Sequence, residues 1–254
     1  MSDDAVLTVE GEAVELVTLN RPERLNALNQ PLTDALLGYF EGKRRDTACR
    51  VILVRGAGRG FCSGADLKAA GSPDRLRDGP DGDWVLRDLM KAMRACPQPI
   101  VSLVHGAAAG GGLAIALASD VILAGASAAF HPAFIKIGLS ASELGVAWRL
   151  QRTIGISAAR EMLLTGRPMD AATALRAGLV SHVVPDEDLL SAGQALAEEM
   201  LRAAPDALRV SKRSLDAALE VGDFATALEF EERGQLLMIR QGAAARRAAA
   251  AEGR

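Results

Sequence analysis

Short, uninterrupted apolar runs alternate along the chain with segments whose apolar residues recur at helical spacing. Strands are predicted at residues 6–9, 14–19, 50–54, 100–104 and 120–124. Helices are predicted at residues 31–42, 84–95 and about 112–119. Continuously apolar strands that are separated by helices are typical of a parallel sheet with both faces covered. We therefore expect an α/β fold.

The last third of the chain has a different pattern, in which helical spacing dominates. Helices are predicted at residues 156–164, 170–177, 189–203, 206–219 and 224–250. We expect a core at residues 1–198 and a C-terminal helical region at residues 199–254. The stretch Gly71 to Asp83 is rich in glycine, proline and charge, which predicts a mobile loop.

Composition narrows the class of protein. Hydrophobic residues make up 49% of the chain and charged residues 24%, as in globular proteins. A net charge of −3 gives no global attraction to nucleic acid, and the apolar runs are too short to span a membrane. Three scattered cysteines and three histidines predict neither a disulfide framework nor a metal site. The expected location is the cytoplasm.

Several motifs follow one another in a fixed order between about residues 5 and 220. They are NRPERLNAL at 20–28, GFCSGADLK at 60–68, GAAAGGG at 106–112, Ser119–Asp120, LTG at 164–166 and AGLV at 177–180. Each motif alone is weak, but the ordered set resembles the enoyl-CoA hydratase/isomerase superfamily, also called the crotonase family.

The resemblance implies a fold, a ligand and an assembly. The fold is a spiral of strand-strand-helix turns, followed by C-terminal helices that mediate trimerisation, so a homotrimer or a dimer of trimers is expected. The ligand is an acyl-CoA thioester, which is the substrate, and no further cofactor is implied. By the same resemblance, Arg24 lies near the CoA phosphates, and the segment Ala65, Asp66 and Leu67 meets the adenine.

The resemblance also implies an oxyanion hole made by the backbone amides of Ala65 and Gly111. Losing one such donor typically costs ~3 kcal/mol of transition-state stabilisation. The predicted position of Gly111 at the start of a helix also supports this role, because the free N–H groups there favour an anion. The alternative is that the glycine run only lets a strand turn tightly into a helix.

The two glutamates that hydratases of the family use around one water molecule are missing. The first is expected two residues after the glycine run, where this chain has Ala114. The second is expected at the position of Phe134. Neither side chain can transfer a proton, so ordinary hydration is put in doubt.

Glu143 is the remaining acidic candidate. Isomerases of the family often have an acidic residue in this loop, and one carboxylate suffices to move a proton from one carbon to another. The alternative is a capping box, in which Ser140 caps a helix and Glu143 reaches back to its amide. His131 is a weaker catalytic candidate than Glu143, and a packed histidine is the alternative. Cys62 is interpreted as packing, because no partner base is evident.

Three functions follow from these residues. The first is double-bond isomerisation of an acyl-CoA thioester with Glu143 as acid and base. The second is hydration of an enoyl-CoA, with water activated by Glu143 or His131. The third is binding of CoA thioesters without turnover, which is motivated by Ala114 and Phe134.

Overall fold

A six-stranded sheet forms the centre of the molecule. The computed structural model describes residues 6–67 and 82–252, without the side chains of residues 82–84 and 243–252. The strands are β1 (Leu7–Glu10), β2 (Val14–Leu19), β3 (Val51–Gly56), β4 (Ile100–Val104), β6 (Val121–Gly125) and β9 (His182–Val184). They are ordered β1-β2-β3-β4-β6-β9, and only β1 runs antiparallel to its neighbour. The predicted parallel sheet is confirmed apart from this edge.

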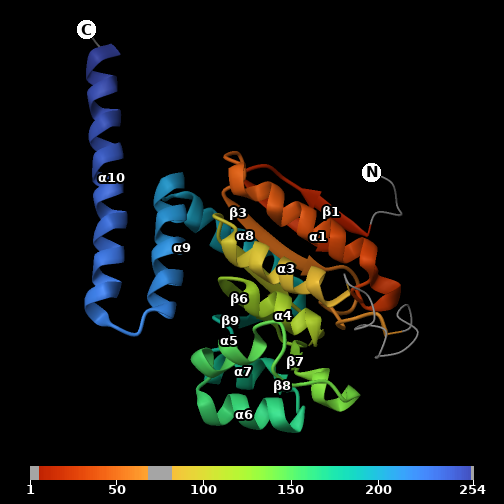
Figure 1. Ribbon diagram of the computed structural model, residues 1–254. Coiled ribbons are helices and arrows are strands. Elements are labelled where there is room, and N and C mark those ends of the chain that lie inside the picture. The colour runs from red at the N-terminus through yellow and green to blue at the C-terminus, as the bar shows by residue number, and fades with distance from the viewer. Residues whose placement is uncertain (1–5, 68–81, 253–254) are drawn as a thin grey trace.

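Helices cover both faces of the sheet, as Figure 1 shows. In β3, Ile52 and Val54 belong to one core cluster, whereas Val51 and Leu53 belong to the other. This alternation follows from the two-residue period of a strand. The first cluster is covered by α1 (Gln30–Gly42), α3 (Gly82–Ala95) and α4 (Gly111–Ala118), and the second by α8 (Leu189–Leu201). Asn29 caps α1 by accepting from the Leu32 amide, at 3.2 Å.

A second, smaller sheet lies beside the main one. Its strands are β5 (Ala107–Ala109), β7 (Ala129–His131) and β8 (Met169–Asp170). Because β4 leads into β5 and then α4, and β6 leads into β7, the chain repeats strand, strand and helix, which is the expected spiral. Three further helices complete the core: α5 (Val146–Thr153), α6 (Ile156–Thr165) and α7 (Ala171–Ala177).

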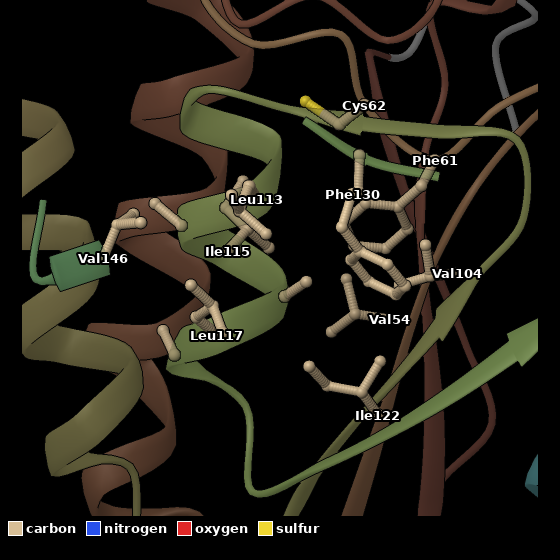
Figure 2. Packing of buried hydrophobic residues seen from close by; sticks show 14 of the residues in the cluster. Val54, Phe61, Cys62, Val104, Leu113, Ile115, Leu117, Ile122, Phe130 and Val146 are labelled. Atoms are coloured by element: carbon tan, nitrogen blue, oxygen red, sulfur yellow. The ribbon is translucent and has the colours of Figure 1, made fainter. Parts of the chain in front are cut away.

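The glycine run carries the chain from β5 into α4. Gly110 has a φ of +49°, which favours glycine, and a Cβ on Gly112 would lie 2.2 Å from the Cys62 carbonyl oxygen. All eight residues of α4 are buried. Figure 2 shows this helix between Phe61, Phe130 and the sheet residues on one side and Val146 on the other. A helix that is apolar all round lies in the core, so the start of α4 has a fixed position.

The chain ends in two helices beside the core, α9 (Pro205–Glu220) and α10 (Phe224–Glu252). In Figure 1, α10 lies outermost and α9 separates it from the core. The expected boundary at 198/199 falls inside α8, and the division into two regions stays a prediction. Among the described residues, no helix is both long and apolar enough to cross a membrane. Most of the loop expected at Gly71 to Asp83 lies outside the described residues.

Candidate active site

A largely apolar pocket of about 850 Å³, including its open mouth, lies beside the start of α4. It is lined by the segment Ser63–Ala65, by Leu67, Leu86, Gly110 and Gly111, and by residues of the chain between Ala133 and Leu144. The pocket therefore brings together Ala65, Gly111 and Glu143, three residues that the sequence predicts as catalytic.

The N–H of Ala65 points away from Leu28, to which the neighbouring residues Gly64 and Asp66 are hydrogen-bonded. The carbonyl oxygen of Gly64 accepts from the Leu28 amide at 2.8 Å, and the Asp66 amide donates to the Leu28 carbonyl oxygen at 2.9 Å. Backbone groups alternate along an extended chain, so the Ala65 N–H points to the opposite side. It has no acceptor in the described part of the chain. Because Ala65 lines the pocket, this N–H is free to bind a ligand oxygen.

The amide of Gly111 lies close to the same segment. A Cβ on Gly64 would lie 3.3 Å from the Gly111 nitrogen, so the two chain segments pack backbone against backbone. Gly111 is the first residue of α4, and the first intrahelical bond joins Ala114 to Gly110. Within residues 6–67 and 82–252, the Gly111 amide has no acceptor. Two free N–H donors and a helix N-terminus therefore lie at one pocket, an arrangement suited to a developing oxyanion.

Glu143 is the only ionisable residue among the described residues that line this pocket. It is half-buried in the loop between Gly138 and Gly145, both of which have positive φ. Its carboxylate forms no hydrogen bond or ion pair with any described residue. The capping-box interpretation is wrong, because α5 begins only at Val146 and its N-cap is Gly145. The Ser140 hydroxyl accepts from the Ser142 amide instead.

The two positions where glutamates are missing are both buried. Ala114 lies one turn into α4 with 1% of its surface exposed. Phe134 lines the pocket, and its Cε1 atom would lie 3.9 Å from a Cβ placed on Gly110. Phe134 thus presents an aromatic ring to this pocket, whereas Ala114 does not line it.

Two of the four residues expected to bind CoA line the pocket. Ala65 and Leu67 line it, and Arg24 is exposed beside Ser63, whose hydroxyl donates to the Arg24 carbonyl oxygen at 3.5 Å. The Asp66 carboxylate accepts two hydrogen bonds from the Arg21 guanidinium, each at 3.1 Å. Asp66 therefore also fixes the Ala65 segment. Arg21 is not among the residues predicted from the sequence, although it lies in the NRPERLNAL motif.

His131 and Cys62 support the site without lining the pocket described above. The His131 carbonyl oxygen accepts from the Gly110 amide at 3.0 Å. Burial, and then the charge of Lys136, lower the pKa of the His131 ring, so the ring is neutral at pH 7. Cys62 is fully buried like Cys49 and Cys96, and burial raises the pKa of its thiol to about 12. A thiol that stays protonated is a poor nucleophile, which supports the packing interpretation of Cys62.

Comparison with known proteins gives the family. The model of the enoyl-CoA hydratase/isomerase family matches residues 10–245. A probable enoyl-CoA hydratase of Mycobacterium bovis is 40% identical over 228 residues, which cover 87% of this chain and 80% of that protein.

Two solved structures are similar as well. The crystal structure of a probable enoyl-CoA hydratase/isomerase from Mycobacterium abscessus has 34% identity and a TM-score of 0.84, with 96% of each chain covered. A monofunctional enoyl CoA isomerase from M. smegmatis has 38% identity and a TM-score of 0.76, with 88% of this chain and 98% of that chain covered. The sequence motifs, the spiral fold and these similarities agree: the chain belongs to the enoyl-CoA hydratase/isomerase family.

Proposed function

We propose that the protein is an acyl-CoA isomerase that moves a double bond along the acyl chain, with Glu143 as its single acid and base. One observation carries this proposal. Among the described residues, the pocket that holds the two free amides of Ala65 and Gly111 is lined by one ionisable side chain, Glu143. A hydratase needs to place and activate a water molecule, whereas an isomerase needs only to move one proton.

In the proposed reaction, Glu143 acts first as the base and then as the acid. The Glu143 carboxylate removes a proton from the carbon next to the thioester carbonyl of a 3-enoyl-CoA. The electron pair moves toward the carbonyl oxygen, and the resulting dienolate is stabilised by the N–H groups of Ala65 and Gly111. The protonated Glu143 then returns the proton to the fourth carbon, which leaves a conjugated 2-enoyl-CoA. The apolar wall formed by Phe134, Ile137 and Leu139 keeps water away from the dienolate.

The variant Glu143→Gln tests the mechanism. We expect kcat for conversion of 3-hexenoyl-CoA to fall about 10²- to 10⁴-fold, because general acid–base catalysis contributes that much. The dissociation constant of hexanoyl-CoA, which cannot react, should stay unchanged. Glu161→Gln, a change of the same kind on exposed α6, is the matched control. Full turnover by Glu143→Gln would remove this residue from the mechanism.

The alternative functions have their own readouts with the wild-type protein. Uptake of oxygen-18 from labelled water into the product of crotonyl-CoA would show hydration. Tight binding of CoA esters without proton exchange at the second or fourth carbon, followed in deuterium oxide, would show a binding protein without turnover. Deuterium uptake together with migration of the double bond supports the isomerase.

We further propose that the chain forms a homotrimer or a dimer of trimers. Large apolar side chains are exposed on α9 and α10, among them Leu215 at 68%, Phe224 at 81% and Ile239 at 53%. Apolar surface of this kind is typical of an interface. Sedimentation analysis should give about three or six times the chain mass of 26.6 kDa.

A further inference from the structure

A second pocket continues the first along the same face of α4. Gly110 and Gly111 line the first pocket, and Ala114, Leu117 and Ala118 line the second, of about 940 Å³ including its open mouth. Residues three and four positions apart share a face of a helix, so the two pockets follow each other along α4. Gly111 and Ala118 are about 10 Å apart along the helix axis, given a rise of ~1.5 Å per residue.

The other walls of the two pockets are also continuous. On α3, Leu86 lines the first pocket and Met90 and Arg94 line the second. Leu144 lines both. The side chain of Ala114 ends at Cβ, so α4 places only a methyl group at this point. A chain that leaves the oxyanion hole along α4 would therefore run toward the second pocket.

The second pocket differs from the first in its charge. The first pocket has Glu143 as its charged side chain among the described residues, whereas four cations and one anion line the second. They are Arg87, Lys91, Arg94, Arg149 and Glu220. The lining of this far end therefore carries more cations than anions.

Arg149 is the cation of this lining that lacks a side-chain partner among the described residues. Asp216 is already paired with Arg94, and Asp120 accepts from Lys212 at 2.8 Å and from Arg94 at 3.5 Å. The Arg149 guanidinium has no ion pair or hydrogen bond within the described part of the chain, although the residue is half-buried. Burial, and then the charge of Arg94, lower the pKa of Arg149, although the charges of Asp120 and Asp216 act in the opposite direction. A half-buried cation that forms no hydrogen bond loses part of its hydration, and an anion placed in the second pocket would offset this loss.

We propose that the second pocket holds the far end of the acyl chain and that Arg149 binds a carboxylate there. The preferred substrates are then CoA thioesters of dicarboxylic acids, whose free carboxylate lies at the end opposite the thioester. This inference rests on the proposed function for the place of the thioester, and it adds the substrate class. Arginine suits the role, because its planar guanidinium binds a carboxylate through two parallel hydrogen bonds.

Binding of saturated CoA esters tests the inference without any reaction. We would compare decanoyl-CoA with the mono-CoA thioester of decanedioic acid by isothermal titration calorimetry. The wild-type protein should bind the dicarboxylic ester at least about tenfold more tightly. In Arg149→Met, affinity for this ester should fall about 10- to 100-fold, as expected for a charge-assisted hydrogen bond, with affinity for decanoyl-CoA unchanged.

Two further variants complete the design. Arg152→Met removes an exposed cation of the same helix, whose guanidinium lies 4.3 Å from the Trp148 ring centroid, and should leave both affinities unchanged. Arg149→Lys keeps the positive charge and should keep part of the preference for the dicarboxylic ester over decanoyl-CoA. Equal affinity of the wild type for both esters, or equal weakening of both by Arg149→Met, would overturn the inference. So would a change of oligomeric mass in Arg149→Met, which would indicate that Arg149 binds another copy of the chain. Since neither ester isomerises, failure of the Glu143 mechanism would leave these results intact.

Discussion

The two sides of the active-site pocket are built in opposite ways. On the oxyanion side, the amides of Ala65 and Gly111 belong to segments joined to the core by backbone hydrogen bonds and by contacts that only glycine permits. On the acid side, Glu143 lies in a loop between two glycines, and its carboxylate forms no hydrogen bond or ion pair with a described residue. Many contacts fix the position of the two amides, whereas no described residue bonds to the Glu143 carboxylate.

Gly112→Ala should have the largest effect on the oxyanion side. Its Cβ would lie 2.2 Å from the Cys62 carbonyl oxygen and 2.7 Å from the Cys62 Cβ, and backbone atoms cannot move aside cheaply. We expect the free energy of unfolding to fall by about 3 kcal/mol, at the upper end for overpacked cores. Urea denaturation measures this. Gly138→Ala is the comparison on the acid side, where a Cβ meets nothing within 4 Å, although its positive φ carries a smaller strain. Equal losses of unfolding free energy in Gly112→Ala and Gly138→Ala would contradict the view that the oxyanion side is packed more tightly than the acid side.

Arg21→Met should disturb the oxyanion side more mildly. Arg21 and Asp66 are 14% and 9% exposed, and their ion pair holds the segment that carries Ala65. We expect a loss of about 2 kcal/mol in unfolding free energy, together with a lower kcat, because the Ala65 amide loses its position. Thermal denaturation and steady-state kinetics check both values. A lower stability with an unchanged kcat would show that this ion pair does not position the amide.

Arg24→Met is the matched change three residues further on. Arg24 is exposed, so the free energy of unfolding should change by less than about 0.5 kcal/mol. If Arg24 lies near the CoA phosphates, KM should rise about three- to fivefold with kcat unchanged, because the contact is the same in the ground state and the transition state. The rise should shrink at high salt. An unchanged KM would remove Arg24 from the CoA site.

His131→Gln should have the smallest effect, and it separates the two acid–base candidates. Isomerase activity should stay within about twofold, as for substitutions away from the reacting groups. The folded-state pKa of His131 lies below the unfolded value of about 6.5, so the unfolded chain binds more protons as pH falls below that value. Wild-type stability should therefore decrease from pH 7 toward pH 5, and the variant should lose part of this decrease. A large loss of activity would make His131 a catalytic group.

The backbone around the proposed oxyanion hole could be predicted from the sequence, because its signals are local. A glycine run after an apolar strand restricts the backbone by itself. That the amides of Ala65 and Gly111 meet one ligand was implied by the ordered motifs and stays a prediction. The acid side was harder to predict. The pattern of Ser140 and Glu143 is typical of a capped helix, yet two positive-φ glycines delay α5 until Val146. The three-residue strand Ala107–Ala109 was missed, because alanine has low strand propensity. The role proposed for Arg149 depends on Asp120 and Asp216 being paired elsewhere, which is a property of the tertiary structure.

The buried thiols have a practical consequence. Cys49, Cys62 and Cys96 all lie inside the core, and burial raises the pKa of each above its ordinary value. Maleimides react with thiolates at the surface, so the folded protein should not be labelled by them. A cysteine introduced on exposed α10 could then carry a fluorophore with no native cysteine replaced. Such a probe would report directly on how copies of the chain approach one another.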